Sequence, residues 1–244
     1  MKLFQFYLVS TPIGNLDDFS ARGVETLRAV DCILAEDTRK ARVLLDRYGI
    51  RVSVRAYHDH NKERIVPGIV REIKEGKRFA LISDAGTPMI SDPGYHLVRR
   101  LIEEGIALTS VPGASAVTTA LVLSGLPPDR FTFYGYVPRK VGERDRAIRE
   151  AADNPYTSIF YESPHRLVKT LEVFSRILGE REVVVARELT KLYEEILRGS
   201  AAELKAHFEA TRPRGELTVL VRGLGKRRAA SESHRSRSGD GRTG

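Results

Sequence analysis

The sequence is poor in the features that mark several protein classes. Its single cysteine, Cys32, excludes a disulfide within the chain, and because it lies in an apolar stretch we expect a buried, unreactive thiol. No run of about 18 apolar residues occurs, so no membrane-spanning helix is predicted. The apolar N-terminal run is interrupted by Gln5 and closed by Pro12 and Gly14, which favours a first strand over a signal peptide. Together these features predict a cytoplasmic protein.

Several common site motifs are also missing. There is no Gly-x-Gly-x-x-Gly after a strand and no Gly-x-x-x-x-Gly-Lys-Ser/Thr, so neither a standard dinucleotide site nor a P-loop is supported. The stretch from Gly113 to Val117 approaches a hydrolase nucleophile elbow but has valine where the second glycine belongs. His58-Asp59-His60 has no further paired ligands, which favours a hydrogen-bonding loop, and we predict no metal site.

What the chain does contain is an alternation of short apolar runs and helical patterns, which predicts an α/β fold. Predicted strands lie near residues 4–9, 31–35, 52–56, 79–82, 107–111, 131–134, 156–161, 182–187, 193–198 and 216–222. Predicted helices lie near residues 20–29, 38–48, 61–75, 92–104, 113–124, 143–152, 163–178 and 200–210. The segment 124–129 combines a helix stop with two prolines, so we predict one domain over 1–124 and a second over 125–225.

Helix starts are indicated by polar residues and prolines. Asp92-Pro93 and Ser163-Pro164 each predict a helix start, and Asn61 is expected to cap the helix that follows it. Ser200 and Glu203 have the spacing of a capping box.

The last nineteen residues, 226–244, carry six Lys or Arg and two acidic residues. Their net charge of +4 is half of the chain's formal charge of +8. They include no large apolar residue, so we predict a disordered basic tail. Such an arm favours polyanions, although a purely solubilising role explains it equally well.

Three turn-rich segments stand where a predicted strand ends and a helix begins: 10–15, 83–88 and 111–116. In open α/β sheets, ligands bind beyond the carboxyl ends of strands, where small residues and free helix N–H groups are available. Three such loops together predict one extended ligand.

These loops, in order with four further motifs, closely resemble the rRNA-modifying branch of the tetrapyrrole methylase superfamily. The further motifs are Glu36-Asp37-Thr38-Arg39, His58-Asp59-His60-Asn61, Tyr161 to Arg166, and Ala186 to Lys191. The resemblance implies two α/β domains with S-adenosylmethionine (SAM) in the interdomain cleft, and usually a homodimer. It implies methylation of the ribose 2′-hydroxyl of a cytidine in the decoding region of 16S rRNA in the 30S subunit.

By the same resemblance, a set of residues is expected to bind the cofactor: Ile13, Asp84, Thr87, Ser115, Ala116, Tyr161 and Leu217. We expect Arg39, Arg166 and Arg187 to contact phosphate or ribose. Glu188 and Lys191 follow an apolar strand directly, and we predict that they are catalytic.

No spacing rule selects the base that takes the hydroxyl proton, and other acidic and histidine side chains stay candidates: Glu36, Asp37, His60, Glu162 and His165. Two other functions stay open. One is methylation of a small tetrapyrrole, and the other is RNA binding without SAM chemistry.

Overall fold

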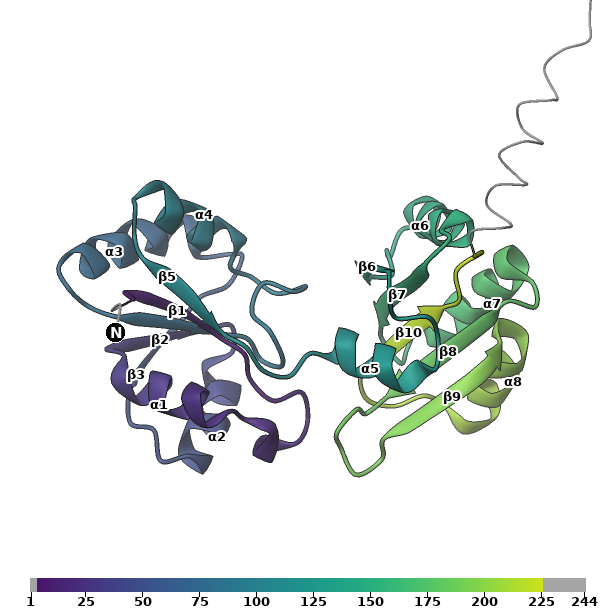
Figure 1. The fold of residues 1–244 in the computed structure, drawn as a ribbon, viewed down its shortest axis with the longest axis horizontal. Helices are drawn as coiled ribbons and strands as arrows, with labels where there is room; N and C mark the ends of the chain where they lie inside the picture. Colours follow the sequence, from purple (N-terminus) through teal and green to yellow (C-terminus); the bar gives the residue numbers. More distant parts are fainter. Residues whose placement is uncertain (1–3, 226–244) are drawn as a thin grey trace, which may run out of the picture. The chain divides into compact units, whose positions relative to one another are not determined.

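The structure is a computed structural model that describes residues 4–225, and the chain divides into two compact units between Ser115 and Ala116 (Figure 1). The sequence predicted this division at residue 124. The helix over 116–124 accounts for the difference, because it packs on the second sheet. The predicted basic tail, 226–244, lies outside the described residues.

The first unit is a five-stranded sheet in which every pair of strands is parallel. Its strands, in the order β3-β2-β4-β1-β5, are β1 (Phe6–Val9), β2 (Cys32–Ala35), β3 (Ser53–Ala56), β4 (Phe79–Ile82) and β5 (Leu108–Val111). Its helices are a 3₁₀ turn (Leu16–Asp18), α1 (Ala21–Ala29), α2 (Thr38–Arg47), α3 (Lys62–Lys74) and α4 (Tyr95–Glu103). The five strands agree with those predicted to within two residues at each end.

Helices cover both faces of this sheet (Figure 1). α1 and α2 pack on one face, where Leu27 and Leu45 meet Ile33, and α3 and α4 pack on the other, where Ile73 and Leu97 are buried. Every residue of β2 and β4 is buried, which explains why these strands are continuous apolar runs. Full burial of each large apolar side chain in these strands, such as Ile33, Leu34 or Phe79, contributes about 1.5–3 kcal/mol.

The second unit has a mixed sheet in the order β6-β7-β10-β8-β9. β6 and β7 are parallel, and β10 runs antiparallel to both β7 and β8. The strands are β6 (Phe131–Tyr136), β7 (Thr157–Glu162), β8 (Glu182–Arg187), β9 (Glu195–Ser200) and β10 (Leu217–Val221). The helices are α5 (Ala116–Ser124), α6 (Val141–Asp153), α7 (Leu167–Leu178) and α8 (Ala201–Thr211).

The two faces of the second sheet are covered differently. Phe160, Val185 and Val219 point into one core with α6, α7 and α8. Leu197 of β9 packs against that core, so Arg198 faces the other side, where its Nε donates to the carbonyl of Ser124 at 2.9 Å. α5 is thus held on the second sheet through its carboxyl end.

Two predicted helix starts are wrong and one capping box is confirmed. α4 begins at Tyr95 after Gly94, whose φ is +146°, and α7 begins at Leu167, so both Pro-containing dipeptides lie in the preceding turns. Asn61 precedes α3 without a side-chain cap bond. Ser200 and Glu203 form the predicted capping box at α8.

Candidate functional site

The first unit gathers three loops at one edge of its sheet. β1 lies between β4 and β5 and all three run the same way, so the loops that follow them meet. The N–H of Thr11 donates to the carbonyl of Gly86 at 2.8 Å, and the N–H of Gly86 donates to the carbonyl of Thr11 at 3.1 Å. Ligands commonly bind at this edge of a parallel sheet.

Hydroxyl groups tie the third loop to the other two. Oγ of Ser10 donates to Oγ1 of Thr87 at 3.1 Å, and Oγ1 of Thr87 donates to the carbonyl of Ala114 at 3.4 Å. Ser115 follows Ala114 directly, and Ala116 is the first residue of α5 in the second unit. Thr87 and Ser115, both predicted to bind the cofactor, therefore lie on one hydrogen-bonded surface.

Two glycines allow these loops to approach each other. Gly86 has a φ of +81°, and a Cβ added there would lie 3.3 Å from Cγ2 of Ile13. A Cβ added at Gly113 would lie 3.0 Å from Cβ of Ser10. The surface is therefore built around positions without side chains, and Ile13, another predicted cofactor contact, lies beside one of them.

Asp84 joins this surface to the loop that follows β2. Its carboxylate accepts from the N–H of Asp37 at 3.2 Å and from Nζ of Lys40 at 2.8 Å. Arg39, predicted to bind the substrate, lies in the first turn of α2, and its 90% exposed side chain pairs with Asp37 at 2.9 Å. Its guanidinium is therefore accessible from solvent.

The same edge holds two carboxyl groups whose pKa values are raised, Asp92 and Glu36. Burial raises the pKa of Asp92 to about 7, and the charges of Glu36 and Asp84 add to this while Lys40 opposes it. Burial, together with the charge of Asp84, also raises the pKa of Glu36. Sequence reasoning assigned Asp92 only to a helix start, because nothing in the local sequence shows that the loop brings it to Glu36.

The second unit also collects its predicted residues at one edge. Leu217 begins β10 and pairs with Glu162 at the end of β7 and with Arg187 at the end of β8. Tyr161 lies next to this position, and its ring contacts Phe133 edge-on with 4.9 Å between the ring centroids. Tyr161 and Leu217, both predicted cofactor contacts, are thus neighbours on adjacent strands.

Glu188 and Lys191 do lie together, just beyond β8. Nζ of Lys191 contacts Glu188 at 2.9 Å and Glu216 at 3.0 Å, and Glu188 also accepts from the N–H of Glu216 at 3.1 Å. Burial would raise the pKa of Glu188, but these hydrogen bonds outweigh it and lower the pKa. Burial would lower the pKa of Lys191, but the two carboxylates raise it. Both side chains are therefore firmly ionised.

Arg166 and Arg187 are engaged in ion pairs within the second unit. Arg166 contacts the buried carboxylate of Glu162 at 2.5 Å and donates to the carbonyl of Val137 at 2.8 Å. Arg187 contacts Glu195 at 2.5 Å. Each is about a quarter exposed, so each can present one side to a phosphate while its partner holds it in place. The sequence did not reveal these anchoring partners.

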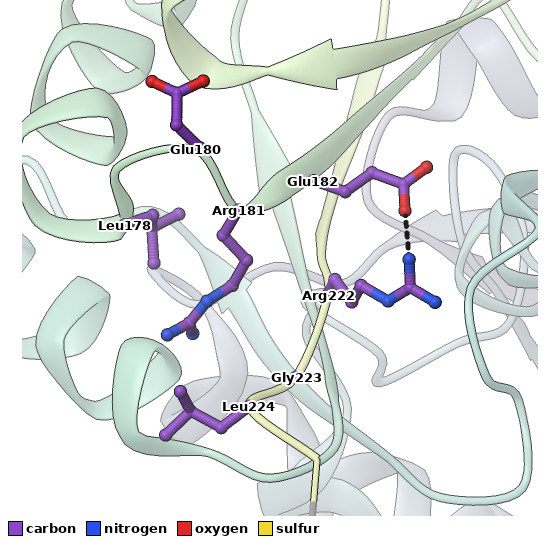
Figure 2. Close-up of a pocket in the computed structure, with 7 residues that line it drawn as sticks. All are labelled: Leu178, Glu180, Arg181, Glu182, Arg222, Gly223 and Leu224. Atoms are coloured by element: carbon purple, nitrogen blue, oxygen red, sulfur yellow. Dashed lines mark hydrogen bonds and ion pairs between the residues drawn. The ribbon is translucent and has the colours of Figure 1, made fainter. Parts of the chain in front are cut away.

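A pocket of about 580 Å³ lies at the opposite edge of the second sheet (Figure 2). It is lined where β8 begins and β10 ends, and Figure 2 shows Arg222 paired with Glu182 at 2.8 Å. Arg181 also lines it and donates to the carbonyl of Ala152 at 2.6 Å. None of the predicted site residues lines this pocket, so we do not assign it to the candidate site.

The profile of the Tetrapyrrole (Corrin/Porphyrin) Methylases matches residues 5–205 of the chain. The chain belongs to the tetrapyrrole methylase family. Several members are named Ribosomal RNA small subunit methyltransferase I. That of Thermotoga maritima is 45% identical over 88% of this chain and 97% of its own length. That of Escherichia coli O157:H7 is 47% identical over 90% of this chain and 78% of its own length.

Solved structures of tetrapyrrole methylases share the fold at much lower identity. A cobalt precorrin-4 methyltransferase has a TM-score of 0.67 at 19% identity, with 89% of this chain and 94% of that chain covered. A diphthine synthase has a TM-score of 0.69 at 14% identity, with 93% and 92% covered. Over the described part of this tetrapyrrole methylase, 4–225, no helix is long and apolar enough to cross a membrane.

Proposed function

We propose that this chain transfers the methyl group of SAM to the ribose 2′-hydroxyl of a cytidine in the decoding region of 16S rRNA. The observation that carries the proposal is the similarity to the relatives named Ribosomal RNA small subunit methyltransferase I, at 45–48% identity over about nine tenths of the chain. The solved small-molecule methylases are only 16–19% identical. This difference favours rRNA over a tetrapyrrole as the substrate.

The edge of the first sheet offers groups that suit SAM. Asp84 supplies a carboxylate for hydroxyl or amino groups, and Thr87 and Ser115 supply hydroxyls. Ile13 supplies an apolar contact beside Gly86, where a Cβ would narrow the space. Ala116 supplies a backbone N–H at the start of α5. When bound, SAM brings a methyl group on a positively charged sulfur, which makes it the electrophile.

The protein must also take up the proton that the 2′-hydroxyl loses. A general base is most effective when its pKa is near the working pH, and Asp92 fulfils this condition. Glu188 accepts hydrogen bonds from Lys191 and the backbone and has a lowered pKa, so we infer that this pair orients the substrate electrostatically. We therefore propose a positioning role for Glu188 and Lys191 in place of the catalytic role predicted from the sequence, which stays a prediction.

The pH dependence of single-turnover methylation separates these roles. We expect Asp92→Asn to remove the rise of the methylation rate with pH near neutrality. Glu188→Gln and Lys191→Ala should instead lower the rate evenly across pH and raise KM for RNA. Loss of this rise in Glu188→Gln, with Asp92→Asn unchanged, would reverse the assignment.

The proposal itself is tested by transfer of labelled methyl from SAM to 30S subunits that lack the modification, with naked 16S rRNA and corrinoid precursors offered in parallel. The expected product is a 2′-O-methylated cytidine in 16S rRNA, located by nuclease mapping. Label only in the corrinoid would assign the chain to tetrapyrrole chemistry. RNA binding without any SAM binding would assign it to the non-enzymatic class.

The predicted homodimer belongs to the same proposal. Light scattering of the purified chain, with and without SAM, gives its mass directly. A monomer at assay concentration would remove the dimer from the proposal and leave the chemistry in place.

A further inference from the structure

The turn between β8 and β9 displays two large apolar side chains in solvent. Leu192 is 88% exposed and Tyr193 is 70% exposed. β8 and β9 lie side by side as a hairpin, and these residues stand in the turn that joins them (Figure 1). A single exposed apolar residue is ordinary, but two in sequence beside the candidate site point to a contact surface.

This turn is held in one conformation by its own polar contacts. Glu188 and Thr190 have φ values of +51° and +65°, which are unfavourable for residues with side chains. Glu188 is fixed by Lys191, and the N–H of Thr190 donates to Glu194 at 2.6 Å. The exposed pair is therefore presented on a turn that is already ordered, which lowers the entropic cost of binding.

A neighbouring loop brings positive charge to the turn. The loop before β10 packs directly on Glu188, because a Cβ added at Gly215 would lie 2.0 Å from its Oε1. Arg212 and Arg214 in this loop are exposed, and neither guanidinium has an ion-pair partner among residues 4–225. In contrast, the carboxylates of Glu188 and Glu216 are both paired with Lys191. Because these two carboxylates share one ammonium group, the five side chains of Glu188, Lys191, Arg212, Arg214 and Glu216 together keep a net charge of +1, and the two arginines are its unpaired members.

We propose that this surface, Leu192 and Tyr193 with Arg212 and Arg214, binds a single-stranded segment of the rRNA substrate. The turn that carries the exposed aromatic ring contacts the loop that carries the two unpaired arginines. Aromatic rings and arginines together are the combination that single-stranded RNA recognition uses, with base stacking on the ring and phosphate contacts to the guanidinium groups. Tyr193 stacks on an unpaired base, and Arg212 and Arg214 contact the flanking phosphates. The inference rests on the proposed function and names the part of the chain that receives the RNA.

The chain has no tryptophan, so one introduced at the turn is a specific fluorescent reporter. Tyr193→Trp should be quenched when a single-stranded oligonucleotide with the decoding-region sequence is added. Phe131→Trp is the matched control, because Phe131 is 42% exposed and begins β6 at the opposite edge of the same sheet. Both variants are first checked for the wild-type circular dichroism spectrum and melting temperature.

Quenching at position 193 alone supports the inference. Equal quenching at both positions, or none at 193, overturns it. Quenching at 193 that depends on protein concentration and needs no RNA overturns it in favour of self-association. The measurement uses neither SAM nor methyl transfer, so it can succeed or fail independently of the proposed activity.

Affinity measurements give the same test without a reporter. We expect Tyr193→Ala to weaken binding of the oligonucleotide by about 5- to 100-fold, as for loss of one base stack, and Tyr193→Phe to retain it. Arg212→Ala and Arg214→Ala should each reduce the slope of log affinity against log salt by about 0.7. SAM affinity should stay the same in all four variants. An unchanged RNA affinity in Tyr193→Ala overturns the stacking contact.

Discussion

The two units present opposite kinds of electrostatic surface at the edges where their predicted site residues lie. In the first unit, Glu36, Asp84 and Asp92 lie near one another and near the cation Lys40, and burial raises the pKa values of Glu36 and Asp92. In the second, Glu188 lies within an ion pair and has a lowered pKa. The first edge can therefore exchange protons near neutral pH, while the second keeps fixed charges.

This contrast indicates a division of labour. An edge whose carboxyl groups have raised pKa values and few positive neighbours suits proton transfer and the binding of a polar cofactor. An edge of paired charges suits accurate placement of a polyanionic substrate, because Arg166 and Arg187 are each held by a carboxylate before the substrate arrives. A substitution that neutralises one charged group should therefore change the pH dependence of the free energy of unfolding in the first unit. In the second unit it should lower the free energy of unfolding itself.

The largest effect is expected where a buried pair is broken in the second unit. The Glu162 side chain is fully buried and accepts from Arg166, Thr170 and the N–H of Ser163. Glu162→Gln leaves Arg166 without its anion, so we expect the free energy of unfolding to fall by about 3 kcal/mol. Urea denaturation measures it.

The matched control for that change is an exposed pair in the same unit. Glu209→Gln removes the contact of Lys205 with Glu209 at 2.9 Å, and it should change the free energy of unfolding by less than about 0.5 kcal/mol. Equal losses in the two variants would show that burial does not distinguish these pairs.

The second prediction concerns the titration of Asp92 in the first unit. Its pKa is about 7 in the folded protein against an ordinary value of 3.8, so the folded state binds this proton more tightly than the unfolded state. The resulting stabilisation is complete below about pH 4 and is lost as the pH rises through about 7. Asp92→Asn should therefore be more stable than wild type at about pH 8, by on the order of 2 kcal/mol.

Thermal melting across this pH range tests the titration of Asp92. The charges of Glu36 and Asp84 raise the pKa of Asp92 and the charge of Lys40 lowers it, so Lys40→Met is a useful companion variant that should raise the pKa of Asp92 further. A pH dependence in Asp92→Asn that matches wild type would place the titration elsewhere.

The fold could be predicted from the sequence further than the site could. Strands such as β4 are runs of buried apolar residues, and the Ser200 and Glu203 box marks its helix unambiguously, so periodicity and capping locate both. The starts of α4 and α7 were misplaced because a residue followed by proline signals a turn as readily as a helix.

The site depends on contacts between residues that are distant in the sequence. The raised pKa of Asp92 requires Glu36 from the loop after β2, and the ion pairs of Lys191 include Glu216 from the loop before β10. Local patterns identified which loops carry polar residues. They did not show which of these carboxyl groups would be paired with a positive charge. Such pairing decides whether a carboxyl group stays ionised or takes up a proton near neutral pH.

A smaller effect is expected from narrowing the loop surface of the first unit. Gly86→Ala adds a Cβ 3.3 Å from Ile13 at a φ of +81°, whereas Gly76→Ala adds one at a φ of +101° with no atom within 4 Å. Both variants should lose about 1 kcal/mol of stability, because alanine is less favourable than glycine at a positive φ. Only Gly86→Ala should also weaken SAM binding, by about tenfold, which corresponds to about 1.4 kcal/mol. Calorimetric titration with SAM measures this, and equal SAM affinity in the two variants would remove the loop surface from the cofactor site.

The smallest change in stability is expected at Arg39 of the first unit, which can be compared with Arg187 of the second. This side chain is 90% exposed and pairs only locally with Asp37, so Arg39→Ala should leave the free energy of unfolding close to that of the wild type. If Arg39 contacts a phosphate, the same variant reduces the salt slope of RNA binding by about 0.7. Arg187→Ala differs because its removal frees Glu195, so it should weaken both stability and RNA binding. A normal salt slope in Arg39→Ala would show that Arg39 contacts no phosphate, and would leave the arginines of the second unit as the proposed phosphate contacts.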